Sequence, residues 1–489
     1  MSEEWSGTRN AENLIAFLRS QRWFGGKGRQ IRDATLTAVI PVTWRASSKE
    51  FAVARARVTT DEGSATYQLF LSDTHKFSDA LEDAAFRRGL VDAFLGGSKF
   101  ESGGTRWIVE SKSAKPLVVP ATAPITMSKS EQTNSSMIID EEAILKLYRK
   151  LEVGIHPDVE VTHFLTIERR FVHVPVLLGT VRFEDSDGTT IAGMLQELVP
   201  GAVDGWSYAL SCSANYFRAG EGEDPALPFV QEAQQLGILT RALHDALASG
   251  DPGGDFDLRP AAPDDIRAWV DETRRTIEDA TTALARAVAE KQLAPEEEAG
   301  ARTILDRRPG YLAWVSELSD GIGSDAGAIS RTHGDYHLGQ VLRSAAGQFL
   351  VIDFEGEPTR PLAERRARRS PVRDVAGMLR SFSYAAAVSG GKEEAGSYAA
   401  AIKTRTPSRL ALAEIRSSRW ERSSREAFLR GYFSEKTGNP ALLPRSQNNA
   451  GRLIALFEAE KVFYELQYEL DHRPDWAWVP LRGIAKLYA

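Results

Sequence analysis

The sequence predicts an α+β fold with two lobes, the first rich in strands and the second rich in helices. Short β-like runs separated by turn residues occupy residues 31–107, and two more apolar runs, SSMIID and AILKLYRK, are joined by the polar pair Glu141–Glu142. After Gly205 the apolar residues recur at three- and four-residue spacing, as in ILTRALHDALAS and LIALFEAEKVFYELQYEL. The change of period therefore divides the chain into a β-rich and an α-rich part.

Within this outline we expect three segments, over residues 1–110, 111–200 and 201–489. The first should open with a helix over residues 11–20, contain several strands, and include a helical stretch near residues 80–94. The glycine run GGKG at residues 25–28 follows a helix rather than a strand, so we interpret it as a turn and not as a nucleotide loop. The second segment should hold the hairpin, a helix near residues 158–167 and two strands. The third is helical with one embedded hairpin, QVLRS to QFLVIDF.

Composition excludes several classes of protein. The net charge of −7 argues against a nucleic-acid binder, which would normally be basic. The single cysteine, Cys212, permits no internal disulfide, and no motif around it indicates a nucleophile. The first residues lack the features of a signal peptide, and no apolar run is long enough to suggest a membrane span. We therefore expect a cytoplasmic protein that binds neither nucleic acid nor membrane.

The stretch RTHGDYHLGQVL, residues 331–342, allows two interpretations. His333 and His337 could ligate a metal, but residues four apart share a face only in a helix, and Gly334 and Gly339 each disfavour a helix by about 1 kcal/mol. No H-E-x-x-H pattern supplies a further ligand. The alternative is a catalytic loop centred on Asp335, and the downstream sequence favours it.

Phosphoryl transfer needs a carboxylate that accepts the hydroxyl proton and side chains that hold a metal on the nucleotide phosphates. Protein kinases place a metal-binding Asn five residues after the catalytic Asp, and here Gln340 stands five residues after Asp335. Asp353 ends the apolar run QFLVID and supplies a second metal ligand. We assign Asp335 as the base, Gln340 and Asp353 as Mg²⁺ ligands, and His333 as a residue that orders the loop. His337 is expected to be structural.

A kinase also needs a cation on the nucleotide phosphates. Lys146 lies in the middle of an apolar strand, where an unpaired charge would be costly, and Glu160 on the following helix is placed to pair with it. Arg149 or Lys150 could be the functional cation instead. A lysine on a solvent-facing edge strand is the remaining alternative.

No glycine-rich phosphate motif precedes the hairpin. The polar stretch MSKSEQTNSSM takes its position, and its backbone amides and hydroxyls could surround phosphates, although an ordinary polar turn has the same composition. The candidate nucleotide-binding residues in it are Ser130, Thr133, Asn134 and Ser135. Further along, MLQELVP at residues 194–200 would connect the lobes, and backbone groups from Glu197 to Val199 would hold the adenine of ATP.

At this point the residues resemble a known family. HGDYHLGQVL, VIDFEGEPTRPLAERRARRSPVRDVAGMLRSFSYAA, QRWFGGKGR and EKVFYELQYELDHRPDWAWVPLRGI are similar to bacterial maltokinases, which share the aminoglycoside-phosphotransferase-like, eukaryotic-kinase-like bilobal fold with an N-terminal cap subdomain. The resemblance implies transfer of the γ-phosphate of ATP, with Mg²⁺, to the anomeric hydroxyl of maltose. The product, maltose 1-phosphate, would feed α-glucan and glycogen synthesis from trehalose.

The resemblance also implies a monomer that could associate with a trehalose-to-maltose isomerase. Three alternatives remain open: a kinase of the same fold acting on another sugar such as glucosamine, an aminoglycoside-type phosphotransferase, and a non-catalytic scaffold. The scaffold would be marked by loss of the base or of the metal aspartate, and both are present in this chain.

Acceptor residues are expected in two places. Glu355, Glu357 and Arg365 lie just past the metal aspartate, and carboxylates and planar donors suit sugar hydroxyls. Tyr464 and Glu469 lie on the late helix, where packing of an amphipathic helix explains the tyrosine equally well.

Overall fold

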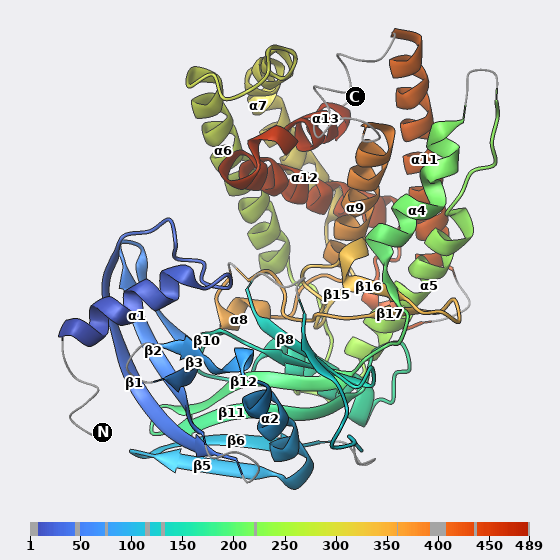
Figure 1. Ribbon diagram of the computed structural model, residues 1–489. Helices are drawn as coiled ribbons and strands as arrows, with labels where there is room; N and C mark the ends of the chain where they lie inside the picture. Colours follow the sequence, from blue (N-terminus) through green and yellow to red (C-terminus); the bar gives the residue numbers. More distant parts are fainter. Residues whose placement is uncertain are drawn as a thin grey trace. The chain divides into compact units, whose positions relative to one another are not determined.

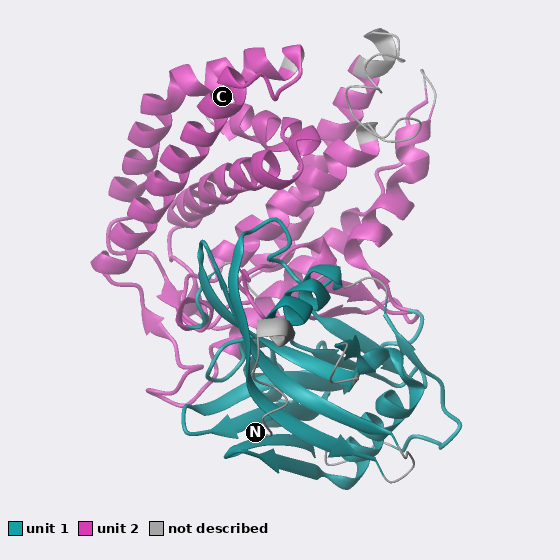
Figure 2. Ribbon diagram, turned by 60° about the vertical axis from the view of Figure 1, so that its left-hand side comes forward, with its two compact units in different colours: residues 1–201, 360–362 teal, residues 202–359, 363–489 magenta. Residues whose placement is uncertain are grey.

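The computed structural model divides the chain into two compact units, the first made of residues 1–201 and 360–362 and the second of residues 202–359 and 363–489 (Figure 2). The structure describes residues 8–44, 49–73, 77–112, 118–128, 133–219, 223–358, 360–391, 407–434 and 438–487. The expected division of the first unit into two segments stays a prediction.

The first unit combines antiparallel strands with short helices (Figure 1). Its helices are α1 (Thr8–Ser20), α2 (Ala84–Gly96) and α3 (Pro157–His163). Its strands are β1 (Ile31–Thr43), β2 (Glu50–Thr60), β3 (Gly63–Asp73), β4 (Ser78–Asp79), β5 (Ser98–Ser102), β6 (Thr105–Ser111), β7 (Ile125–Met127), β8 (Ser135–Ile139), β9 (Ala143–Leu147), β10 (Lys150–Leu151), β11 (Leu177–Asp185) and β12 (Gly188–Glu197).

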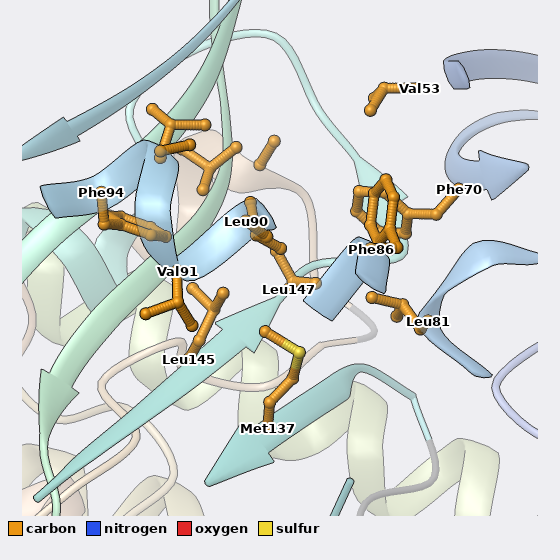
Figure 3. Packing of buried hydrophobic residues seen from close by; sticks show 14 of the residues in the cluster. Val53, Phe70, Leu81, Phe86, Leu90, Val91, Phe94, Met137, Leu145 and Leu147 are labelled. Atoms are coloured by element: carbon orange, nitrogen blue, oxygen red, sulfur yellow. The ribbon is translucent and has the colours of Figure 1, made fainter. Parts of the chain in front are cut away.

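These strands form two sheets that share one core. One sheet has the order β1-β2-β3-β10 with β4 paired to β3, and the other has the order β5-β6-β11-β12-β9-β8-β7. Helix α2 contributes Phe86, Leu90 and Phe94 to the cluster that also holds Met137 and Leu145 of the second sheet (Figure 3). Burying these large apolar side chains is the main term that stabilises the unit. Strands from the first and second expected segments therefore fold together.

Helix α2 starts later than expected. Residues 80–82 form a separate 3₁₀ turn capped by Asp79, and α2 begins at Ala84 because the Asp83 carboxylate accepts a hydrogen bond from the Ala85 amide at 2.8 Å. The aspartates at positions 79 and 83 thus cut one expected helix into two.

The expected hairpin is present. Strands β8 and β9 pair antiparallel, with Ser136 opposite Lys146 and Met137 opposite Leu145. Side chains alternate across a strand, so Ala143, Leu145 and Leu147 point into the core and Lys146 points to the other face. Lys146 therefore shares a face with Ile144, as the alternation predicts, but that face is not the one that builds the core.

The second unit is mostly helical (Figure 1). Its helices are α4 (Gly205–Arg218), α5 (Val230–Leu247), α6 (Pro263–Ala289), α7 (Pro295–Ile322), α9 (Val372–Gly391), α11 (Pro407–Tyr432), α12 (Gln447–His472) and α13 (Trp478–Leu487), with the short α8 (Leu362–Arg365) at its border. Its strands are β13 (Val203–Asp204), β14 (Arg259–Pro260), β15 (Ala328–Ile329), β16 (Val341–Arg343) and β17 (Phe349–Val351). Strands β16 and β17 form the predicted embedded hairpin, and β13 pairs with its edge.

Helix α12 is packed by other helices on several sides. It contacts α6, α7 and α9, and Phe457 and Phe463 meet Trp269 of α6 and Tyr311 of α7 at ring distances of 5.4 and 5.5 Å. Charged residues on such a helix need partners, because burying an unpaired charge is costly. Among the described residues, no helix is long and apolar enough to cross a membrane.

Candidate active site

The segment that carries Asp335 is irregular rather than helical. It runs from β15 to a 3₁₀ turn at Leu338–Gln340, and Gly334 takes a φ of 87°, a conformation that costs glycine little. A metal held by His333 and His337 would require both to lie on one face of a helix. Because the segment is not helical, they do not. Within the described part of the chain, no group of three His, Cys, Asp or Glu residues is arranged to hold a metal ion.

The backbone of this catalytic loop is held by Asp374, at the start of α9. Its carboxylate accepts hydrogen bonds from the amides of His333 and Gly334 at 2.8 and 3.0 Å, and it lies 3.1 Å from Nε2 of His244. Burial alone would raise the pKa of Asp374, but the hydrogen bonds and charge of these partners outweigh it and hold the pKa below its ordinary value. The buried carboxylate thus fixes the loop two residues before Asp335.

Sequence reasoning did not single out Asp374. The sequence feature that could have identified it is its position within PVRDVAGML, the apolar start of a helix. A buried carboxylate there needs hydrogen-bond donors. Those donors lie 41 and 130 residues away in the chain, at His333 and His244.

His333 connects the loop to the hairpin. Its Nε2 lies 2.9 Å from the carbonyl oxygen of Ile352, and its Nδ1 accepts from the amide of Asp335 at 3.4 Å. Nδ1 of His337 accepts from the Gly339 amide at 3.0 Å, and burial lowers the pKa of the His337 imidazole, which keeps it neutral at neutral pH. These contacts are those of residues that shape the loop. The catalytic part assigned to His333 stays a prediction.

The structure brings the two expected metal ligands together. The side-chain amide of Gln340 donates to a carboxylate oxygen of Asp353 at 2.9 Å, and the Ile352 amide donates to the Gln340 carbonyl at 3.0 Å. Asp353 has a φ of 68°, in the left-handed region that residues other than glycine rarely adopt. Strain of this kind gathers at functional sites. Asp353 lies two residues after the end of β17.

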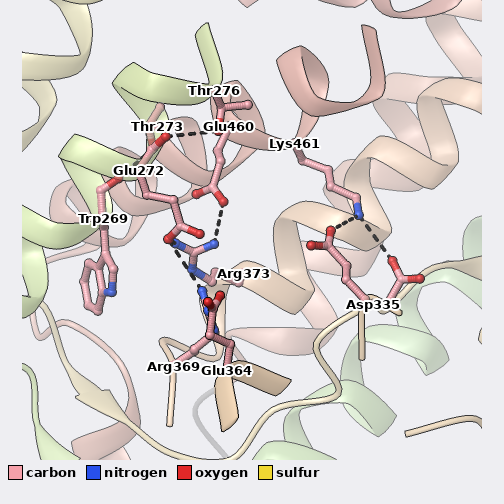
Figure 4. Close-up of polar contacts among 11 residues, drawn as sticks. Trp269, Glu272, Thr273, Thr276, Asp335, Glu364, Arg369, Arg373, Glu460 and Lys461 are labelled. Atoms are coloured by element: carbon pink, nitrogen blue, oxygen red, sulfur yellow. Dashed lines mark hydrogen bonds and ion pairs between the residues drawn. The ribbon is translucent and has the colours of Figure 1, made fainter. Parts of the chain in front are cut away.

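A lysine that sequence reasoning missed pairs with the proposed base. Nζ of Lys461, on α12, lies 3.2 Å from Asp335 and 3.1 Å from Glu357 (Figure 4). Burial alone would lower the pKa of Lys461, but the charges of Asp335 and Glu357 raise it above its ordinary value, so the ammonium stays protonated. The available signal was a lysine directly before the buried pair Val462 and Phe463, where an anionic partner is required.

The other acceptor candidates lie in three different environments. Nη1 of Arg365 donates to the Glu355 carbonyl at 3.1 Å. The ring of Tyr464 lies 5.1 Å from the Lys461 ammonium, so this tyrosine belongs with the Asp335 cluster. The carboxylate of Glu469 accepts from Tyr384 and Arg473 and is 1% exposed, which commits it to helix packing. Acceptor binding by these residues stays a prediction.

In the first unit, Lys146 lies on the face of the second sheet that α3 contacts. Nζ of Lys146 lies 3.4 Å from Asp158 of α3, and the Tyr148 hydroxyl donates to the same carboxylate at 3.1 Å. Sequence reasoning placed Glu160 as the partner. Asp158 is a partner it did not name, and pairing with Glu160 stays a prediction.

Arg149, an alternative cation, has a structural position. Its side chain is 2% exposed, and it donates to Asp79 at 2.6 Å and to Oγ of Ser135 at 2.7 Å. Lys150 is exposed on β10, which pairs with β3. Lys146 is therefore the candidate cation whose position fits best.

The polar stretch is described only in part. Ser130 lies outside the described residues, Thr133 and Asn134 form a bend, and Ser135 begins β8, anchored by Arg149. At the connector, the amides of Glu197 and Leu198 donate to Val176 and Glu142 at 2.9 and 2.8 Å. These two amides are therefore already paired, and adenine binding by the remaining backbone groups from Glu197 to Val199 stays a prediction.

Known proteins share this architecture. A solved structure of a glucosamine kinase in complex with glucosamine, ADP and inorganic phosphate matches with a TM-score of 0.65 at 20% identity, covering 93% of this chain and 94% of that one. A glucosamine kinase in its crystal form A matches with a TM-score of 0.63 at 21% identity, covering 93% of this chain and 92% of that one. The chain therefore shares the fold of these glucosamine kinases.

The sequence comparisons define the family. The maltokinase N-terminal cap domain matches residues 17–111, and the phosphotransferase enzyme family matches residues 129–357. Glucosamine kinase of Mycolicibacterium smegmatis is 30% identical over 74% of this chain and 79% of its own length. Glucosamine kinase of Streptacidiphilus jiangxiensis is 26% identical over 75% and 74%. The chain belongs to the phosphotransferase enzyme family, as a maltokinase-like kinase with a maltokinase-type cap.

Proposed function

We propose that this protein is an ATP-dependent sugar kinase that phosphorylates the anomeric hydroxyl of maltose. The observation that carries the proposal is the group formed by Asp335, Gln340 and Asp353 on one anchored loop and hairpin, in a chain with a maltokinase-type cap. Phosphoryl transfer depends on positioning and charge stabilisation, and a loop fixed by Asp374 provides the first of these.

Each residue has a chemical role in this proposal. Asp335 accepts the proton of the sugar hydroxyl as that oxygen attacks phosphorus, and His333 keeps the loop in shape through the Ile352 carbonyl. Lys461 holds the Asp335 carboxylate in place through its contact of 3.2 Å. On the nucleotide side, Lys146 would contact the phosphates, while Asp158 sets the direction of its ammonium.

The residues present fit a bound Mg²⁺. Gln340 and Asp353 supply side-chain oxygens, the ligand type that Mg²⁺ prefers, and the ion normally completes its shell with water and nucleotide phosphates. When bound, it would neutralise charge on the phosphates during transfer. Monomeric state, an isomerase partner and a cytoplasmic location stay predictions.

Glucosamine is the second candidate acceptor. Two relatives whose similarity covers about three quarters of this chain are glucosamine kinases. A coupled assay of ADP release with maltose, glucosamine and aminoglycosides as acceptors separates the candidates. We expect turnover to be highest with maltose. Turnover with glucosamine and none with maltose would contradict the maltose assignment while leaving the sugar-kinase proposal intact. Turnover with aminoglycosides alone would contradict both.

A further inference from the structure

Lys461 lies at the junction of the proposed base and the proposed acceptor residues. It approaches Asp335 from α12, whereas Asp335 and Glu357 lie in the loops before and after the β16–β17 hairpin (Figure 4). The side chains of Asp335, Glu357 and Lys461 are 25%, 12% and 25% exposed, so the cluster is partly open to solvent. A ligand can therefore reach it.

Three carboxylates of α12 pair with arginines. Glu458 pairs with Arg425 at 2.6 Å, Glu460 pairs with Arg373 at 2.7 Å, and Glu465 pairs with Arg380 at 2.8 Å. These carboxylates are thus held within the helical packing of the second unit. Asp335 and Glu357 are the partly exposed carboxylates that Lys461 bridges.

This arrangement suits a neutral sugar better than an amino sugar. An ammonium on the acceptor could pair with Asp335 or Glu357 only in competition with Lys461, because the ammonium of Lys461 already bridges both carboxylates and would lie next to the second cation. A pair of neutral hydroxyls meets no such penalty, because one can accept from Lys461 while the other donates to Glu357. The ammonium of Lys461 is therefore the group that disfavours binding of an amino sugar.

We infer that Lys461 is a specificity-determining residue that selects uncharged sugars and disfavours amino sugars. The inference rests on the proposed sugar-kinase function and narrows its substrate class. It is independent of whether the neutral acceptor is maltose or another neutral sugar.

Glucose and glucosamine form the matched pair of probes, since they differ only in the hydroxyl or ammonium at C2. We expect kcat/KM of the full-length protein for glucose to exceed that for glucosamine by at least about tenfold. In Lys461→Met this ratio should fall at least about tenfold, mainly because glucosamine improves. Lys461→Arg, which keeps the charge, should retain a ratio close to that of the unmodified protein.

Lys486→Met provides a control of equal charge change. Lys486 lies on α13 and pairs with Glu421, apart from the cluster, so its variant should leave the ratio unchanged. If a monosaccharide is not turned over, its inhibition constant against maltose replaces kcat/KM. If Lys461→Met does not fold, Lys461→Gln replaces it. The ratio of kcat/KM for glucose to that for glucosamine in the unmodified protein then serves as an independent test.

Two results would overturn the inference: a preference for glucosamine over glucose in the unmodified protein, or a ratio that Lys461→Met leaves unchanged. If another neutral sugar outcompetes maltose, the maltose assignment fails alone, and the ratio of glucose to glucosamine still responds to Lys461. If glucosamine is the preferred acceptor, the maltose assignment and this inference both fail, while the sugar-kinase proposal stands.

Discussion

Two lysines of this molecule each pair with carboxylates, but the pairs are built in different ways. Lys146 lies 12 residues before Asp158, on a strand followed by a helix of the first unit, and Asp158 is 3% exposed. Lys461 lies 126 residues after Asp335, which is 25% exposed. The first pair is local and shielded, as suits a cation that is held ready for phosphate. The second is assembled from distant segments and leaves the carboxylate open to an acceptor.

The largest loss of turnover is expected on substitution of Asp353, a proposed metal ligand. Asp353→Ala should abolish Mg²⁺-dependent turnover, because it removes the carboxylate that lies with Gln340 at the end of β17. Initial rates across a Mg²⁺ titration measure this. Asp306→Ala, an exposed position on α7, is the control. An unchanged Mg²⁺ requirement in Asp353→Ala would remove that residue from the metal site.

A smaller effect on activity is expected on substitution of Lys146, which pairs with Asp158. Lys146→Met should raise KM for ATP about tenfold or more, since a charge-assisted hydrogen bond contributes about 1.5–3 kcal/mol. Lys150→Met, at an exposed position on β10, should leave KM unchanged. Steady-state kinetics with ATP varied at saturating sugar check both. If the two variants behave alike, Lys146 is not the phosphate cation, and the comparison between the two lysines fails.

The smallest effect on ATP binding is expected from Asp374, because its carboxylate holds the loop that carries Asp335. Asp374→Asn should lower the free energy of unfolding by about 2 kcal/mol at neutral pH, because the buried carboxylate loses charge-assisted hydrogen bonds. The pKa of Asp374 is depressed in the folded state, so its contribution is present above the unfolded pKa of about 3.9 and is lost as the pH falls through the folded value.

Chemical denaturation at a series of pH values measures this contribution. The difference between the unmodified protein and Asp374→Asn should shrink as the pH falls below about 4. A difference that is constant with pH would show that the carboxylate charge is not what holds the loop. ATP binding, measured in parallel, should be unaffected.

Local patterns made much of this fold predictable. The apolar runs SSMIID and AILKLYRK predicted the β8–β9 hairpin, and three- and four-residue spacing predicted α5 and α12. Alternation placed Lys146 on the face of Ile144, but the expectation that this face points inward was wrong, because Ala143, Leu145 and Leu147 build the core. The run QFLVID predicted that Asp353 ends a strand near Gln340, and the two side chains are hydrogen-bonded. These features depend on residues close in the chain, where strand and helix periods govern side-chain direction.

The other features of the site depend on tertiary contacts, which the local strand and helix periods of a sequence do not reveal. Lys461 meets Asp335 and Glu357 only because α12 packs beside the catalytic loop, and Asp374 meets His244 across 130 residues. Sequence reasoning also treated residues 80–94 as one helix, because the caps at Asp79 and Asp83 interrupt it without breaking the apolar pattern.

The central claim is that this chain transfers phosphate to the anomeric hydroxyl of maltose with Asp335 as the base. Phosphorus NMR of the product formed from maltose and Mg·ATP tests it most directly, with Asp335→Asn alongside. The account predicts a phosphate coupled to the anomeric proton, and a rate about 10²-fold or more lower in the variant, which should still bind ATP. Phosphate at another carbon, or an equal rate in the variant, would contradict it.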